Sequence, residues 1–232
     1  MGSGRTDAEL LQRARALQAE AVDLLVRLDL EAAFPGFGAA EPVGSVASGL
    51  MVWRDLDVVF SAPHATAAAV FEGLARLAAR PGLLAVDFRD ERGERRPTER
   101  PADERYYLVC SCQGPSGRWK VDITVWLHAV DRPHRIEAER LRDAPLDQRL
   151  AILRLKDLWH RSPQYPDQVG GVDVYTACWI TACGRQGSSA PTCGAGACPP
   201  TPGQAPVLRK DPSPTRCPRG AEPERAMMLR AG

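Results

Sequence analysis

Residues 43–60 read VGSVASGLMVWRDLDVVF, and this stretch decides the fold. Its second half is an apolar run that contains two acidic residues, Asp55 and Asp57. Because alternate residues of a β-strand point to opposite faces of a sheet, we expect both carboxylates on one face, with Leu56 and Val58 in the core. Two like charges held this close favour a bound cation, and oxygen ligands suit magnesium. A solvated Asp-Leu-Asp at the end of a strand is the alternative interpretation.

A third carboxylate lies in another predicted strand. Residues 118–127 read RWKVDITVWL, so Asp122 stands in a segment where polar and apolar residues alternate. An aspartate among apolar neighbours is costly to bury unless it is exposed or bound to a partner. A metal ion shared with Asp55 and Asp57 would be such a partner. The sequence therefore predicts a site that brings these three aspartates together.

The rest of the chain supplies the elements around these strands. A capping box formed by Thr6 and Glu9 begins a helical pattern, and Gly-rich and Pro-rich segments separate the later elements. The predicted helices cover residues 7–33, 64–80, 134–142, 145–161 and 172–177. The predicted strands cover residues 51–61, 83–88, 106–112 and 118–127, with a surface loop at 89–104 and a hairpin turn at 113–117.

This order of elements predicts an α+β protein. A small, mixed and mostly antiparallel sheet with packed helices is followed by a helical C-terminal lobe. We expect an N-terminal helix in residues 1–34, a catalytic domain in 35–130, a helical lobe in 131–177 and a tail in 178–232.

Composition and charge narrow the class of partner. The formal net charge is +1, so no strong field attracts a long nucleic acid or an anionic membrane. The polar N-terminal residues lack the apolar segment of a secretory signal, and we expect a cytoplasmic protein. In a reducing compartment, Cys110 and Cys112 are two strand residues on one face rather than a disulfide framework.

The tail differs from the rest of the sequence. From residue 178 onward the periodicity stops, while nine of the 20 prolines and five of the seven cysteines gather there. The composition is typical of a disordered tail. Two alternatives are a frameshift that replaced the native C-terminus near residue 177 and a zinc site, although the spacing of the cysteines is unlike that of common zinc sites. The candidate zinc ligands are Cys178, Cys183, Cys193 and Cys198.

Several of these residues occur together in a known pattern. The chain resembles the polymerase-β nucleotidyltransferase superfamily, whose bacterial members include aminoglycoside nucleotidyltransferases and minimal nucleotidyltransferases. The resemblance extends over residues 40–130. The residues that carry it are Gly44, Ser45, Gly49, Asp55, Leu56, Asp57 and Asp122.

The resemblance implies a role for each of these polar positions. Gly44 and Ser45 would hold the triphosphate of a nucleotide. Asp55 and Asp57 would bind two magnesium ions, and Asp122 would bind one of them and help to activate an acceptor hydroxyl. Two metal ions suit the in-line transfer of a phosphoryl group because they stabilise both the attacking and the leaving oxygen.

The function implied is the transfer of a nucleoside monophosphate from a nucleoside triphosphate, expected to be ATP, to an acceptor hydroxyl. The acceptor is a small molecule or a protein side chain. The alternative is a non-catalytic module that binds a nucleotide or a partner and retains the same fold. Arg54 and Lys156 could contact phosphate, but an ion pair for Arg54 and a solvated helical position for Lys156 are the simpler expectations.

Overall fold

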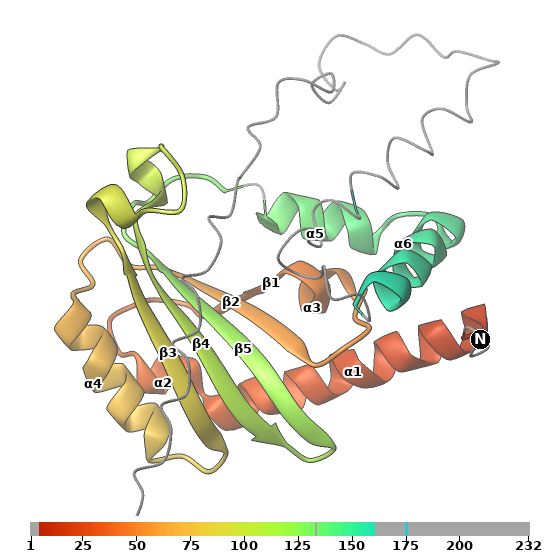
Figure 1. The fold of residues 1–232 in the computed structure, drawn as a ribbon, viewed down its shortest axis with the longest axis horizontal. Coiled ribbons are helices and arrows are strands. Elements are labelled where there is room, and N and C mark those ends of the chain that lie inside the picture. The colour runs from red at the N-terminus through yellow and green to blue at the C-terminus, as the bar shows by residue number, and fades with distance from the viewer. Residues whose placement is uncertain (1–4, 133, 161–174, 176–232) are drawn as a thin grey trace, which may run out of the picture.

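The computed structural model describes residues 5–132, 134–160 and 175. Five strands form one sheet in the order β1-β2-β5-β4-β3 (Figure 1). The strands are β1 (Glu41–Val43), β2 (Asp55–Ser61), β3 (Leu83–Glu91), β4 (Arg105–Gly114) and β5 (Gly117–Trp126). Only β2 and β5 pair in parallel in this described sheet, and the other three pairs are antiparallel. The predicted α+β class, with its mixed and mostly antiparallel sheet, is confirmed.

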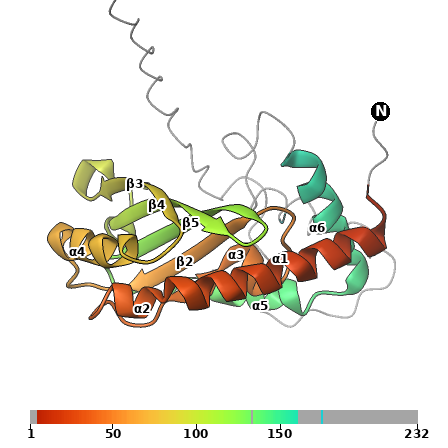
Figure 2. The same cartoon turned by 90° about the horizontal axis from the view of Figure 1, so that it is seen from below.

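The helices lie on one face of the sheet and at one end of it. Figure 2 shows α1 and α2 beneath the strands, while α4 packs beside α2 and β3. The C-terminal helix α5 packs on α3, and α6 packs on α1. The helices are α1 (Asp7–Leu28), α2 (Leu30–Ala33), α3 (Gly44–Ser48), α4 (Ala67–Ala78), α5 (His134–Arg142) and α6 (Leu146–Trp159).

The predicted helix over residues 7–33 is divided into two. The capping box at its start is present, because the Thr6 hydroxyl accepts from the Glu9 amide and the Glu9 carboxylate accepts from the Thr6 amide. At Asp29 the backbone turns left-handed, with φ of 41°, and its amide closes α1 on the Leu25 carbonyl. The Asp29 carboxylate accepts from Arg80 at 3.0 Å, so the end of α1 is tied to the end of α4.

Gly44 and Ser45 form the start of a short helix, α3. Gly44 starts α3 with φ of 63° and Gly49 ends it with φ of 70°, both in the left-handed region that glycine tolerates. Inside the helix, the Ser48 hydroxyl donates to the Gly44 carbonyl at 3.0 Å. The strand predicted to begin at Met51 therefore starts only at Asp55, after the chain has left α3.

Two apolar clusters hold the elements together. The larger one joins the inner face of the sheet to α1, α2 and α4, and it includes Leu56, Val58 and Ile123. The smaller one joins the start of α1 to α6 and includes Leu10 and Ile152. The N-terminal half of α1 therefore packs against α6, and its C-terminal half packs against the sheet.

The region after α4 is more ordered than a loop. β3 continues to Glu91, and two 3-10 turns (Gly93–Arg95 and Pro101–Asp103) occupy part of the segment that was predicted as a loop at 89–104. Of the predicted helix at 172–177 only Tyr175 is described, and the tail with its predicted disorder, zinc site or frameshift lies outside the described residues. Within the helices described, none is both long and apolar enough to span a bilayer.

Candidate functional site

Parallel pairing of β2 and β5 brings the predicted aspartates to one place. Asp57 stands opposite Asp122 in the register, and Asp55 stands opposite Lys120. Adjacent strands lie roughly 4.8 Å apart, so the Asp57 and Asp122 backbones are immediate neighbours. The alternating residues Leu56 and Ile123 are fully buried on the opposite face. The expectation that Asp55 and Asp57 share the face away from the core is met, and Asp122 joins them there.

Gly44 lies directly against this acidic face. A Cβ atom added to Gly44 would lie 3.0 Å from Asp57 Oδ2, so the start of α3 approaches the carboxylate as closely as a residue without a side chain allows. Ser45 is the next residue of α3 and is buried. The structure therefore gathers Gly44 beside the aspartates, with Ser45 next in the chain, and their role toward a phosphate stays a prediction.

Asp122 is buried and only one of its oxygens is used. Its side chain is 10% exposed, and Oδ2 accepts from the Tyr107 hydroxyl and from Lys120 Nζ, the latter at 2.7 Å. Asp122 Oδ1 is buried without a hydrogen-bond partner among the described residues. A buried carboxylate oxygen left without a donor is costly, and a ligand such as a cation would satisfy it.

Lys120 bridges two of the three carboxylates. Besides Asp122, its ammonium group donates to Asp55 Oδ1 at 3.1 Å. Burial lowers the pKa of Lys120, but the Asp55 and Asp122 carboxylates outweigh that effect and raise it, so the group stays charged. Neither Lys120 nor Tyr107 was predicted from the sequence. The signal for Lys120 was present, because residues i and i+2 of a strand share a face.

The pKa of the Asp57 carboxyl group is raised. Burial, the Asp55 carboxylate and then the Asp122 carboxylate raise its pKa from 3.8 to about 7, against the opposing effect of Lys120 and Lys156. These are the two causes expected for a buried carboxylate beside like charges. A bound divalent cation would offset both effects on the pKa, because its charge stabilises the ionised carboxylate.

The donor set fits a hard divalent cation in charge and in ligand type. It offers carboxylate oxygens, one of them unsatisfied, in a half-buried cluster with excess negative charge. As the side chains stand, however, no three acidic, His or Cys groups within the described ranges lie close enough together to hold a metal ion. The Lys120 ammonium group lies between Asp55 and Asp122 and contacts both carboxylates.

Two basic residues that could have contacted phosphate have structural partners instead. Arg54 forms the expected ion pair, with Nε 2.9 Å from Glu20 Oε2. Lys156 differs from the solvated lysine that was expected, because it is 2% exposed and donates to the Leu50 carbonyl at 2.8 Å. Its ammonium group also lies 5.2 Å from the centre of the Trp53 ring. Arg54 thus links the segment that precedes β2 to α1, and Lys156 links that segment to α6.

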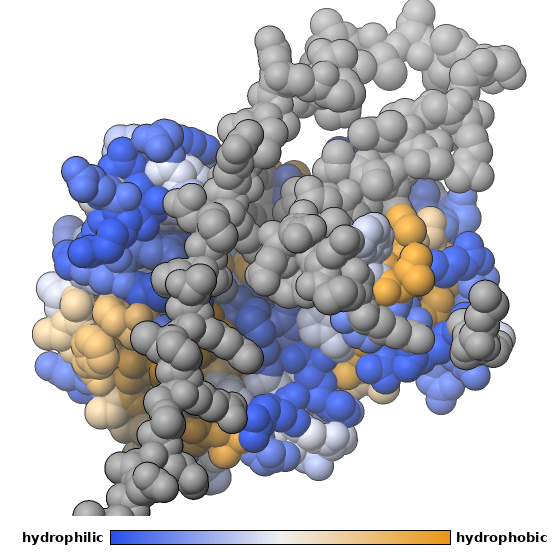
Figure 3. Space-filling model, in the orientation of Figure 1, coloured by the Kyte–Doolittle hydropathy of each residue, from blue (hydrophilic) through white to orange (hydrophobic). Residues whose placement is uncertain are grey.

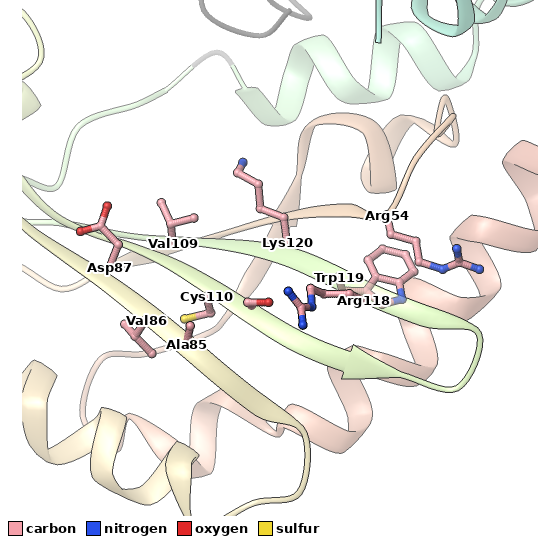
Figure 4. A pocket seen from close by; sticks show the side chains of 10 residues that line it. Arg54, Ala85, Val86, Asp87, Val109, Cys110, Arg118, Trp119 and Lys120 are labelled. Atoms are coloured by element: carbon pink, nitrogen blue, oxygen red, sulfur yellow. The ribbon is translucent and has the colours of Figure 1, made fainter. Parts of the chain in front are cut away.

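Lys120 also lines a hollow of about 440 Å³ over β3, β4 and β5. Figure 4 shows Lys120 and Val109 rising from β5 and β4 on one side of the strands, with Arg54 and Arg118 toward the hairpin end. Lys120 therefore stands between the hollow and the carboxylates. The hydropathy surface in Figure 3 is apolar over α4.

Comparison with known proteins finds a likeness to solved structures. No protein-family model matches the chain, and no curated protein matches it. Among solved structures, the Cid1 poly(U) polymerase bound to Mg and 3'-dATP superposes with a TM-score of 0.47 at 14% sequence identity. The match covers 75% of this chain and 54% of that one. A likeness at this level does not assign a family, so a functional conclusion has to come from the site itself.

Proposed function

We propose that this chain is a magnesium-dependent nucleotidyltransferase of the polymerase-β type. The observation that carries the proposal is the placement of Asp55, Asp57 and Asp122 on the same face of two parallel strands, with Gly44 against Asp57. The unsatisfied Asp122 Oδ1 adds support, because a buried carboxylate oxygen needs a cationic or donor partner. Charge and ligand chemistry favour magnesium over softer metals.

The residues would divide between metal binding and nucleotide binding. Asp55, Asp57 and Asp122 would hold two magnesium ions, which when bound neutralise the phosphates and stabilise the leaving pyrophosphate. The backbone of Gly44 and the hydroxyl of Ser45 would orient the triphosphate, because a Cβ at residue 44 would fill the approach to the acidic face. Tyr107 and the strand pairing fix the orientation of Asp122.

The reaction transfers a nucleoside monophosphate. The acceptor oxygen forms a bond to the α-phosphorus while the bond between that phosphorus and the bridging oxygen breaks, and pyrophosphate leaves with the bridging oxygen. Asp122 takes up the proton of the acceptor hydroxyl. ATP is the proposed donor, and a small molecule or a protein side chain the proposed acceptor. A formal net charge of +1 disfavours a long nucleic acid. We place the protein in the cytoplasm.

A transfer assay tests the proposal. The full chain is incubated with each of the four α-³²P-labelled nucleoside triphosphates, magnesium and a panel of hydroxyl-bearing acceptors. We expect magnesium-dependent labelling of an acceptor with release of pyrophosphate, and its loss in Asp57→Asn. Asp143→Asn serves as the matched control, because Asp143 is 71% exposed and lies between α5 and α6. Labelling that survives both in EDTA and in Asp57→Asn would exclude this mechanism.

One observation favours a second candidate, a non-catalytic module that binds a nucleotide. Lys120 already neutralises two of the three carboxylates, as a site that has lost its metal ions would require. This candidate predicts nucleotide binding in calorimetry that is unchanged by EDTA, and no labelled product with any acceptor. Magnesium-dependent binding that disappears in Asp57→Asn favours the enzyme instead.

A further inference from the structure

Lys120 is placed as a cation in the acidic site. Its Nζ atom lies 3.1 Å from Asp55 Oδ1 and 2.7 Å from Asp122 Oδ2, so one ammonium group contacts carboxylates of both parallel strands. An ammonium group is a point charge with three donors and no acceptor, and it satisfies carboxylate oxygens much as a small metal ion does. The position that a metal ion shared by these two aspartates would take is therefore held by the protein's own side chain.

We infer that Lys120 is the internal counter-ion of the metal-free site and that a divalent cation binds by displacing it. This inference rests on the proposed function, because it assumes that the aspartates are metal ligands. An ammonium group and a divalent cation repel each other, and both would be held by the carboxylates of Asp55 and Asp122. Binding of one therefore requires departure of the other, and the two are negatively coupled.

The Lys120 side chain is more exposed to solvent than its two carboxylate partners. Its side chain is 46% exposed, whereas those of Asp55 and Asp122 are 19% and 10% exposed. The hollow of about 440 Å³ beside it receives a displaced lysine chain without disturbing the core. Lys120 also keeps the carboxylates from repelling one another when no metal is bound. It is a positioning residue that sets how tightly the site takes a metal.

The first experiment measures metal affinity without nucleotide. Mn²⁺ accepts the same oxygen ligands as magnesium, and electron paramagnetic resonance counts the free ion. Removal of a charge-assisted competitor is expected to tighten Mn²⁺ binding about tenfold in Lys120→Met. Arg76→Met is the matched control, since Arg76 is 48% exposed on α4 and loses the same charge far from the site. It should bind Mn²⁺ like the unaltered chain.

The second experiment follows Lys120 in the unaltered chain. The sequence contains three lysines, Lys120, Lys156 and Lys210, so a sample labelled with ¹³C,¹⁵N-lysine gives few side-chain signals. The Lys120 signal is identified by its loss in Lys120→Arg. We expect it to move during a magnesium titration toward the position of a solvated lysine. A merely structural lysine would not move.

The outcomes separate the two proposals. Equal or weaker Mn²⁺ binding in Lys120→Met, or a Lys120 signal that is unmoved at saturating magnesium, overturns the displacement while leaving the nucleotidyltransferase assignment intact. Absence of Mn²⁺ binding in the unaltered chain and in Lys120→Met overturns both. If Lys120→Met fails to fold, Lys120→Gln replaces it, and the titration of the unaltered chain decides without any variant.

Discussion

Replacement of Asp57 by asparagine should stabilise the metal-free protein. Burial and the Asp55 and Asp122 carboxylates raise the pKa of Asp57 from 3.8 to about 7. An acid whose pKa is higher in the folded chain than in the unfolded chain binds more protons when folded. The free energy of unfolding therefore falls as the pH rises between these two values. Asparagine has nearly the same shape and carries no charge, so Asp57→Asn removes this fall in the free energy of unfolding.

The size of the effect is set by the pKa shift. At 1.36 kcal/mol per pKa unit, the ionisable side chain destabilises the fold by roughly 2 kcal/mol at pH 5 and roughly 4 kcal/mol at pH 8. These values are upper limits, because Asp57 keeps some contact with solvent, which screens the repulsion. The advantage of Asp57→Asn should therefore grow by up to about 2 kcal/mol between pH 5 and pH 8.

Urea unfolding of the unaltered chain and of Asp57→Asn, in EDTA at pH 5 and pH 8, measures this difference. Asp143→Asn, an exposed carboxyl on the loop before α6, should change the free energy of unfolding by less than about 0.5 kcal/mol at either pH. Millimolar magnesium should reduce the advantage of Asp57→Asn, because the metal stabilises only the unaltered site. An asparagine variant with the same or lower stability at pH 8, or an effect independent of pH, would refute the reasoning.

Three other substitutions test the packing and the site. In Gly73→Ala the new Cβ would lie 2.1 Å from the Phe34 ring, and we expect a loss of about 1–3 kcal/mol in urea unfolding, despite the better helix propensity of alanine. Full stability would show that α4 packs less closely on α2. Gly44→Ala should lower label transfer about tenfold or more, with an unchanged circular dichroism spectrum, because it adds a side chain against Asp57 at a positive φ. Tyr107→Phe removes the hydroxyl that orients the carboxylate on β5 and should slow transfer several-fold at unchanged Tm. A normal rate would mean that the hydroxyl is dispensable.

Much of the sheet could be predicted because its sequence alternates. The period of two in β4 and β5 indicated which residues enter the core, and the glycines between them indicated a hairpin. The same period placed Asp55 and Asp57 on one face. What it could not give was the neighbour of β2, because that pairing joins segments far apart in the chain. The contact of Lys120 with Asp55 depends on that register and was missed for this reason.

Errors in the helical regions have a different cause. The break between α1 and α2 falls at Asp29, which pairs with Arg80, and a local pattern does not contain that partner. Lys156 was expected in solvent because a lysine within a helix usually is, yet the Leu50 carbonyl and the Trp53 ring give it a buried place. Both residues make tertiary contacts with partners that a local sequence pattern does not contain.

The two strands that carry the aspartates are the only parallel pair in the described sheet, and they join residues 65 positions apart in the chain. β2 leaves the ribosome long before β5, and the hairpin of β4 and β5 forms quickly because its contacts are local. Closure of β5 onto β2 is then the slow, long-range event. A nascent chain that has released β2, β3 and β4 holds Asp55 and Asp57 but not Asp122, so the three aspartates come together only when β5 pairs with β2.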